Sequence, residues 1–356
     1  MIQNMLFSLP ISCCKRVLAH PYHFSENLLD YLQAWPWPMS TKLFVFHRCV
    51  VCMQMSRHVD TAPCHLFFQV WKAAVPSSKA RNSARERTCH GSHSSVHKPS
   101  NKLQGKVALV TGGDSGIGRS VCHLFAQEGA TVAFTYVKGH EDKDAKETLQ
   151  AIKQVKASDA KEPMALAADL GFDENCKKVV DEVANAYGRI DILVNNAAEQ
   201  YKAASVEDID EARLERVFRT NIFSCFFMTG HALKHMKEGG SVICTTSIVA
   251  YKGSDSLLDY CATKGAIVSF IRGLALQLVK RGIRVNGVAS GPIWTPLIPA
   301  SFDEEEVQRF GNEVPMQRAG QPYEVGPTYV FLASEAFSSY YTGQVFHPNG
   351  GVIVNA

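Results

Sequence analysis

Lys106-Val-Ala-Leu-Val-Thr111 is a short apolar run typical of a β-strand, and it leads directly into Gly112-Gly-Asp-Ser-Gly-Ile-Gly118. The residues that follow favour a helix with Val121 and Leu124 on one face, and Gly129 ends that helix. Strand, glycine turn and helix in this order can cradle a pyrophosphate, because glycines let the anion approach bare N–H groups at the helix N-terminus. A glycine-rich turn alone is as often an ordinary loop, so the units after it decide between the two.

Apolar strands and amphipathic helices alternate after this turn. We expect strands over 131–136, 164–168, 190–194 and 241–246, and helices over 174–187 and 214–236. Such alternation indicates an α/β doubly wound (Rossmann) fold, in which helices cover both faces of a parallel sheet. Ligands of such a sheet bind at the carboxyl ends of its strands. The candidate cofactor residues at these ends are Gly112, Asp114, Ser115, Gly116, Ile117, Gly118, Asp169, Leu170, Asn196 and Ala197.

The residue that closes the second strand bears on the choice of cofactor. An Asp or Glu at this place binds the ribose 2′-hydroxyl of NAD and repels a 2′-phosphate. Here Thr135 and Tyr136 take the place, followed by Lys138, which favours NADP(H). Because Glu141 and Asp142 stand close by, Lys138 is equally interpretable as a solvated surface charge, and NAD(H) stays open.

Ser247, Tyr260 and Lys264 form the candidate catalytic group. The last two are one helical turn apart, which places a phenol and an ammonium on the same side of a helix. We expect the buried face of that helix to be carried by Ile267, Ile271, Leu274 and Leu278. A Tyr-x-x-x-Lys pair alone is usually ordinary helix surface, but its joint order with the glycine turn and the strand-end residues indicates a site.

These residue types suit proton transfer to or from a carbonyl oxygen. Reduction needs a proton donor at that oxygen, and oxidation needs a base. We expect the ammonium of Lys264 to favour the phenolate and so to lower the pKa of Tyr260 towards neutral. Ser247 can hold the substrate oxygen, and Asn221 can place a water that connects Lys264 to solvent.

Thr111-Gly112-x-x-x-Gly116-Ile-Gly118, Asn195-Asn196-Ala197, Ser247 and Tyr260-x-x-x-Lys264 resemble the motifs of the short-chain dehydrogenase/reductase family. The likeness covers about 97–356, and the runs 195–201 and 291–299 resemble plant members that act as NADPH-dependent aldehyde reductases or as sugar and polyol dehydrogenases. It implies a seven-stranded sheet, a homodimer or homotetramer, and a catalytic group of Ser247, Tyr260, Lys264 and Asn221.

The resemblance also implies roles for the segment after the sixth strand. Ile293 and Thr295 would bind the nicotinamide carboxamide, and Trp294 with 297–299 would form a mobile substrate lid. Two departures stand out: Ser290 precedes Gly291 where the family usually has Pro, which removes a fixed φ beside the nicotinamide, and Ala198 replaces a usual Gly.

Residues 1–100 differ in composition from the remainder. They hold 11 of the chain's 37 basic residues but only four of its 34 acidic residues, so they carry +7 and the body carries −4. An acidic body gives no footprint for nucleic acid. We expect an extension that is either a transit peptide or a leader without function, followed by one domain over 101–356. A metal site at Cys49 and Cys52 is a third and weaker interpretation, since one CxxC is poor evidence, and we predict no metal.

The cysteines and the hydropathy pattern bear on the compartment. Five scattered cysteines in the body indicate buried packing residues in a reducing compartment: Cys122, Cys176, Cys225, Cys244 and Cys261. We see no apolar run of the roughly 18 residues needed to span a bilayer, since the best candidate, 43–53, is broken by His47 and Arg48. We therefore expect a soluble protein of the chloroplast or the cytoplasm.

The function predicted is hydride transfer with NADP(H) to small aldehydes, or from sugars and polyols in reverse, with Tyr260 as general acid and base. The rival is a catalytically silent protein that keeps the fold to bind a nucleotide or to form oligomers. Intact Ser247, Tyr260 and Lys264 oppose that rival, and Ser290 favours it.

Overall fold

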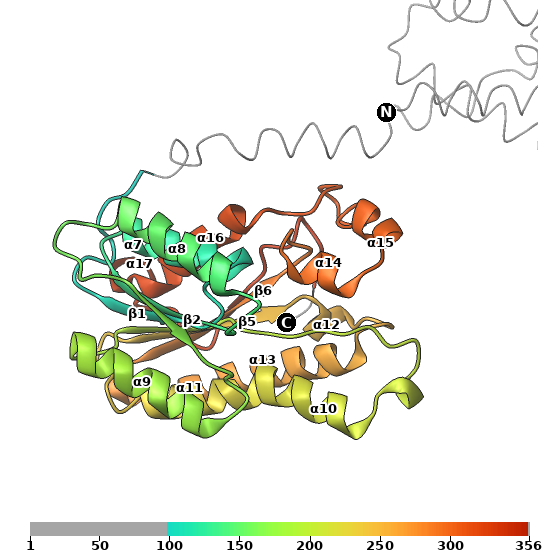
Figure 1. The fold of residues 1–356 in the computed structure, drawn as a ribbon, viewed down its shortest axis with the longest axis horizontal. Helices are drawn as coiled ribbons and strands as arrows, with labels where there is room; N and C mark the ends of the chain where they lie inside the picture. Colours follow the sequence, from blue (N-terminus) through green and yellow to red (C-terminus); the bar gives the residue numbers. More distant parts are fainter. Residues whose placement is uncertain (1–97, 355–356) are drawn as a thin grey trace, which may run out of the picture. The chain divides into compact units, whose positions relative to one another are not determined.

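The computed structural model describes residues 98–354, which form a parallel sheet with helices on both faces (Figure 1). The sheet has seven strands in the order β3-β2-β1-β4-β5-β6-β7, and every pairing is parallel. The fold predicted from the alternation of strands and helices is confirmed. The strands are β1 (Val107–Val110), β2 (Thr131–Tyr136), β3 (Met164–Ala167), β4 (Ile192–Asn195), β5 (Ser241–Ser247), β6 (Arg284–Ser290) and β7 (Val345–Phe346).

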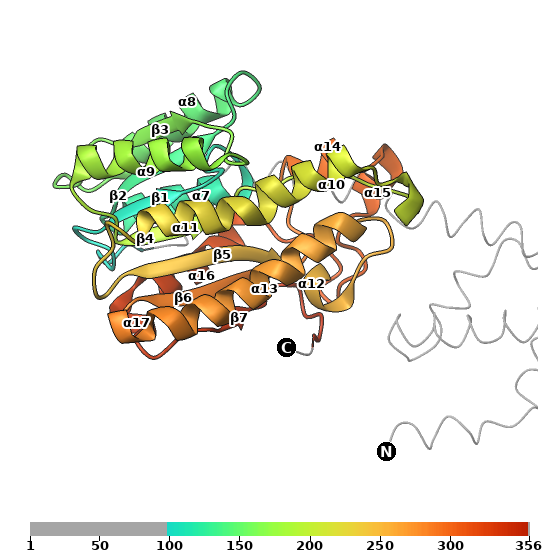
Figure 2. The ribbon, with the colours of Figure 1, turned by 90° about the horizontal axis from the view of Figure 1, so that it is seen from below.

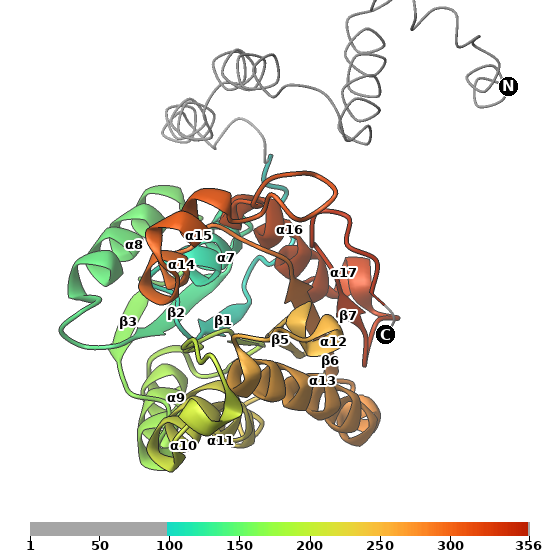
Figure 3. The ribbon, with the colours of Figure 1, turned by 90° about the vertical axis from the view of Figure 1, so that its right-hand side faces the viewer.

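Three long helices cover each face of the sheet (Figures 2 and 3). One layer consists of α7 (Gly116–Gln127), α8 (Asp142–Val155) and α16 (Pro322–Ala333), and the other of α9 (Asp173–Tyr187), α11 (Ser224–Ala232) and α13 (Leu258–Leu278). Each layer closes its own apolar core against the sheet, around Phe125 in the first and Ile271 in the second. The shorter helices are α10 (Glu211–Phe218), α12 (Val249–Lys252), α14 (Leu297–Ser301), α15 (Glu304–Arg309) and α17 (Glu335–Ser338), with 3₁₀ turns η2 (Val206–Asp208) and η4 (Val279–Arg281).

The single helix predicted over 214–236 is wrong. The chain instead forms α10, a five-residue π-helical segment η3 (Arg219–Phe223) and then α11, which ends at Ala232. A π segment widens the helix by one residue per turn and is frequent at functional sites. Here it buries Asn221 completely.

One stretch, Leu258–Arg281, is long and apolar enough to cross a membrane by length and mean hydropathy, so the expectation that the chain has no such run is wrong. It comprises α13 and η4. Core helices of soluble proteins pass the same test, and α13 packs against β5 and β6 (Figure 2). Ile267, Ile271 and Leu278 are buried as predicted, and Leu274 is partly buried.

The cysteines and the possible metal sites can be compared with the expectations within residues 98–354. Cys122, Cys176, Cys225 and Cys244 are free and buried, and Cys261 is partly buried, which confirms them as packing residues. Within 98–354 no group of three or more His, Cys, Asp or Glu residues is placed to hold a metal ion. The transit-peptide and leader interpretations, and the metal site at Cys49 and Cys52, concern positions outside the described residues.

Candidate active site

A pocket of about 710 Å³ opens at the carboxyl ends of the strands, across β1 and β4 where the strand order reverses. Three predicted residues do not line it: Gly118 and Asn221 are buried behind its wall, and Lys138 is exposed outside it. The other predicted site residues do: Gly112, Asp114, Ser115, Gly116, Ile117, Tyr136, Asp169, Leu170, Asn196, Ala197, Ser247, Tyr260, Lys264, Ile293 and Thr295.

The glycine turn brings backbone to the pocket where side chains would not fit. Gly112 and Gly116 have φ of +61° and +51°, a conformation that favours glycine. A Cβ at Gly118 would lie 1.9 Å from the carbonyl oxygen of Gly112. Thr135 ties the turn to β2, because its Oγ1 accepts from the N–H of Gly112 (3.2 Å) and its carbonyl accepts from the N–H of Gly113 (3.0 Å).

Asn196 holds three strand ends together. Its Nδ2 donates to the carbonyl oxygens of Thr111 (3.0 Å) and Gly112 (3.1 Å), and its own N–H donates to Thr111 Oγ1 (2.8 Å). Its Oδ1 accepts from Thr245 Oγ1 (3.1 Å). The Asn196 side chain therefore links β1, β4 and β5 and fixes the position of the glycine turn through the Gly112 carbonyl.

The turn and the start of α7 fit a bound dinucleotide. The first N–H groups of a helix have no partners within it and attract phosphate, and Ser115, Gly116 and Ile117 at this end of α7 line the pocket. Asp114 lines it too, with a buried Oδ2 that has no hydrogen-bond partner within the protein. Burial raises the pKa of this carboxyl group.

The second strand ends beside an acid that the sequence pattern did not assign. Glu141 precedes α8, and its Oε2 accepts from the N–H of Val137 at 2.6 Å, directly after β2. Glu141 lines the pocket, and burial raises its pKa. An acid is therefore present beside the end of β2, five residues after Tyr136, because the chain turns back there. Lys138, expected to favour a 2′-phosphate, does not line the pocket.

Ser247 at the end of β5 meets Tyr260 and Lys264 from the first turns of α13. The Ser247 hydroxyl lies near enough to the Tyr260 phenol to lower its pKa. The Nζ of Lys264 lies 5.3 Å from the centre of the Tyr260 ring and donates to the carbonyl oxygen of Thr245 at 2.9 Å. The Lys264 side chain is fully enclosed, at 2% exposure.

Burial dominates the electrostatics of this group, contrary to the expectation that Lys264 lowers the pKa of Tyr260. Burial raises the pKa of Tyr260, and the nearby Ser247 hydroxyl offsets only part of the rise. Burial also lowers the pKa of Lys264 to about 8. The phenol is therefore protonated at neutral pH, which suits it to donate a proton to a carbonyl oxygen.

The side-chain amide of Asn221 is held by protein groups, and its expected role of placing a water stays a prediction. Its Oδ1 accepts from the N–H of Glu199 (2.8 Å), and its Nδ2 donates to the carbonyl oxygen of Glu199 (2.9 Å) and to Thr263 Oγ1 (3.1 Å). Both amide protons are used. A water between Lys264 and solvent would have to bind an oxygen of Asn221, not its amide nitrogen.

The segment after β6 closes the far side of the pocket. Ile293 and Thr295 line it, and so do Leu297 and Ile298 of α14. Trp294, expected in a lid, is not part of the wall, and its ring lies 6.3 Å from that of Phe310. The lid role of Trp294 and 297–299 stays a prediction.

Ser290, where the family usually has Pro, completes β6 without disturbance. It pairs in register with Ser247, and its carbonyl oxygen accepts from the N–H of Ile248 at 3.0 Å. The glycine after it is required, since a Cβ at Gly291 would lie 2.7 Å from the Cα of Asn349.

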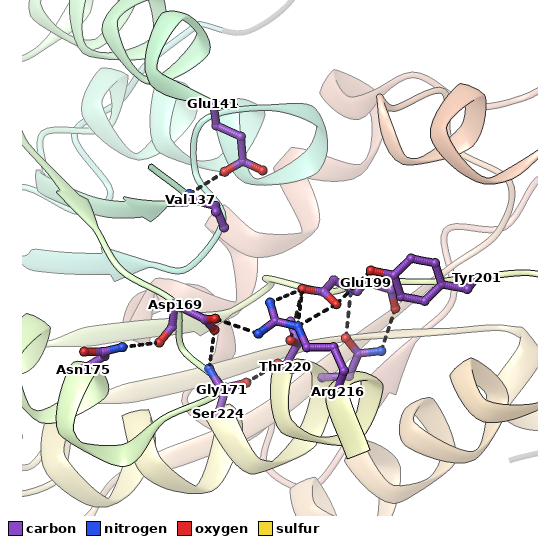
Figure 4. Close-up of polar contacts among 11 residues, drawn as sticks. Val137, Glu141, Asp169, Gly171, Asn175, Glu199, Tyr201, Arg216, Thr220 and Ser224 are labelled. Carbon is purple, nitrogen blue, oxygen red and sulfur yellow. Dashed lines mark hydrogen bonds and ion pairs between the residues drawn. The ribbon is translucent and has the colours of Figure 1, made fainter. Parts of the chain in front are cut away.

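Two charged side chains that the motifs did not single out also line the pocket. Glu199 follows β4, and Arg216 lies on α10 (Figure 4). Glu199 falls inside the run 195–201 that carried part of the resemblance, whereas Arg216 is one of several charges on an amphipathic helix and had no sequence signal.

Comparison with known proteins agrees with this geometry. A family model described as enoyl-(acyl carrier protein) reductase matches residues 112–353, and glucose and ribitol dehydrogenase of Daucus carota is 75% identical over 264 residues, covering 74% of this chain and 90% of the relative. The chain belongs to the short-chain dehydrogenase/reductase family. NADPH-dependent aldehyde reductase 1, chloroplastic, of Arabidopsis thaliana is 74% identical over 263 residues, 74% of this chain and 91% of that one.

A solved structure shows the same fold. The short chain dehydrogenase of Burkholderia cenocepacia J2315 in complex with NADP superimposes with a TM-score of 0.64 at 31% identity, covering 70% of this chain and 98% of that one. The family resemblance inferred from the motifs and the assignment as a dehydrogenase/reductase are confirmed.

Proposed function

We propose that this enzyme reduces small aldehydes with NADPH and oxidises sugars or polyols in the reverse direction. The observation that carries the proposal is the meeting of Ser247, Tyr260 and Lys264 in the pocket that also holds the glycine turn. The printed activities of the carrot and Arabidopsis relatives support the substrate class.

Each side chain has a role that follows from its contacts. The nicotinamide, when bound, supplies or accepts the hydride. The Tyr260 hydroxyl gives its proton to the carbonyl oxygen as the alcohol forms. Ser247, which lines the same pocket as Tyr260, orients the same oxygen. The Lys264 ammonium, held by the carbonyl of Thr245, places a positive charge 5.3 Å from the centre of the Tyr260 ring, on the side of the pocket where the phenolate is left after transfer.

We propose NADP(H) as the cofactor, with NAD(H) as a weaker alternative. The start of α7 would hold the pyrophosphate, Asp169 and Leu170 would face the adenine side, and Ile293 and Thr295 would face the nicotinamide. The NADPH-dependent Arabidopsis relative and the NADP complex from Burkholderia support this choice. The carboxylate of Glu141 at the end of β2 is the feature that favours NAD(H).

The test is Tyr260→Phe, assayed by NADPH oxidation with a panel of aldehydes and, in reverse, with sugars and polyols. We expect a loss of roughly 10²- to 10⁴-fold in kcat, the usual contribution of a general acid. NADPH binding, titrated by fluorescence, should stay close to that of the parent. A variant as active as the parent would overturn the mechanism.

The rival is a silent nucleotide-binding protein. Ser290 was its support in the sequence, and the regular pairing of Ser290 in β6 weakens it. Purified parent protein that binds NADPH but turns over no compound of the panel would favour this rival.

We further propose a homodimer or homotetramer. Phe226 on α11 and Leu276 on α13 are 55% and 79% exposed, and Phe226 packs edge-to-face against Phe270 of α13, so the two helices present one apolar face. Light scattering at micromolar concentration should give at least twice the monomer mass, and a monomer would contradict the proposal.

We propose that the basic extension is a transit peptide that directs the protein to the chloroplast; the alternative compartment is the cytoplasm. The chloroplastic Arabidopsis relative and the surplus of basic residues support it. N-terminal sequencing of the mature protein should find a start near residue 80–100, and an intact Met1 would contradict it.

A further inference from the structure

Arg216 joins two carboxylates that follow different strands (Figure 4). Its Nη1 lies 2.6 Å from Oδ2 of Asp169, which follows β3. Its Nε donates to both carboxylate oxygens of Glu199 at 3.1 Å, and its Nη2 donates to Oε1 of the same group. All three side chains line the cofactor pocket. The Arg216 guanidinium therefore pairs with two carboxylates in the wall of the pocket where the anionic dinucleotide would bind.

Both the carboxylate and the backbone of Glu199 are hydrogen-bonded to neighbouring residues. Thr220 and Tyr201 donate hydroxyl hydrogens to its carboxylate, each at 3.2 Å, in addition to Arg216. Its backbone N–H and carbonyl are both bonded to the side chain of Asn221. Asn221 is fully buried, and both protons of its side-chain amide are already donated. A shift of Glu199 would therefore move Asn221 as well.

The same chain of contacts reaches the catalytic helix. Asn221 donates to Thr263 Oγ1, and Thr263 Oγ1 donates to the carbonyl oxygen of Tyr260 at 2.7 Å. Thr263 directly precedes Lys264. An unbroken series of hydrogen bonds thus runs from Arg216 through Glu199 and Asn221 to the turn of α13 that carries the proton donor.

We propose that Arg216 is a positioning residue, which sets Asn221 against the catalytic turn of α13 through Glu199 and neutralises the two carboxylates at the cofactor pocket. This inference rests on the proposed function. The side chains of Arg216 and Asp169 are each 36% exposed and that of Glu199 is 23% exposed, so solvent screens both ion pairs and they stabilise the fold little. Removing Arg216 should therefore affect binding and turnover more than stability.

Arg219 provides a matched control on the following segment. It pairs with Glu215, one turn earlier on the same helical run, at 2.7 Å, and it does not line the pocket. Arg219→Met removes an arginine of similar exposure, with its ion pair to Glu215 and its contacts with the Phe172 and Phe223 rings, and leaves the ion pairs of Asp169 and Glu199 in place. An arginine with only a structural role at position 216 should behave in the same way.

The experiment measures NADPH dissociation constants by fluorescence titration, kcat and KM for an aldehyde, and thermal unfolding, for four variants beside the parent. Arg216→Met should lower kcat roughly 10- to 100-fold, as expected for misplaced catalytic groups, and weaken NADPH binding roughly three- to fivefold, with a melting temperature close to that of Arg219→Met. Arg216→Lys should recover NADPH binding but not kcat, since lysine keeps the charge but not the planar fork of donors.

The fourth variant, Arg216→Met combined with Glu199→Gln, separates charge from packing. Removing the Glu199 carboxylate should tighten NADPH binding in the Arg216→Met background, because the carboxylate is then unbalanced. A further loss of affinity in the double variant, or Arg216→Met that matches Arg219→Met in kcat and dissociation constant, overturns the inference. A parent that binds NADPH but reduces no aldehyde contradicts the proposed function alone, and the binding data then decide the role of Arg216.

Discussion

Replacing Lys264 by Met should change the pH dependence of stability in a defined direction. Burial lowers the pKa of this ammonium from the usual 10.5 to about 8. Between these two values the unfolded chain binds more protons at this site than the folded chain does, so the contribution of Lys264 to the unfolding free energy rises with pH and is lost as the pH falls through 8. At about 1.4 kcal/mol per pKa unit, the shift corresponds to about 3 kcal/mol.

The assay is urea unfolding of parent and Lys264→Met, without cofactor, between pH 7 and 10. Burial raises the pKa of the Cys122 thiol, which lowers stability above pH 9 in both proteins and cancels in their difference. Burial also raises the pKa of the Cys244 thiol, but the Lys264 ammonium lowers it, so losing Lys264 adds to the difference in the same direction. The advantage of the parent over the variant should grow by about 2–3 kcal/mol from pH 7 to pH 10. Lys280→Met, at an exposed lysine, controls for the loss of a lysine from the unfolded chain. A difference that stays constant across this range would refute the reasoning.

Three further substitutions test the pocket and its support. Gly118→Ala should weaken NADPH binding at least roughly tenfold, because the new Cβ would lie 1.9 Å from the Gly112 oxygen; an unchanged dissociation constant contradicts this. Arg213→Met should lower the unfolding free energy by about 3–5 kcal/mol, since it leaves the fully buried Asp259 carboxylate without its ion pair at 2.8 Å; a loss under about 1 kcal/mol in urea unfolding, the value of an exposed pair, argues otherwise. Glu141→Gln should tighten the binding of NADPH more than that of NADH, because a negative charge leaves the end of β2; equal changes in the two titrations disprove it.

The sheet could be predicted because its strands are buried on both faces. Val107–Val110 and Ile192–Asn195 read as continuous apolar runs, and their observed ends lie within two residues of the predicted ones. β7 has only two residues, too few for a periodic pattern, and only the family resemblance implied a seventh strand. The π segment over Arg219–Phe223 has no glycine or proline to mark it, so the pattern over 214–236 predicted one uninterrupted helix.

The catalytic group could be predicted because its spacing is local. Tyr260 and Lys264 share one helical turn, and Ser247 ends a strand whose neighbours were recognisable. The pKa of Tyr260 could not be predicted, because it depends on how completely the folded chain encloses the phenol. The return of Glu141 to the end of β2 and the clasp of Asn221 on Glu199 depend on turn geometry, which residue types alone do not determine.

The catalytic residues on α13 are positioned by hydrogen bonds with η3 and not by the outer wall of the pocket. Asn221 on η3 and the Tyr260–Lys264 turn of α13 are bridged by Thr263, so their relative placement follows from contacts between two helices in one layer. The outer wall comes instead from α14 and the loop that contains Phe310, which share no hydrogen bond with that bridge in the described residues. We therefore expect substitutions in the outer wall to change which aldehydes are reduced while the proton donor stays in place.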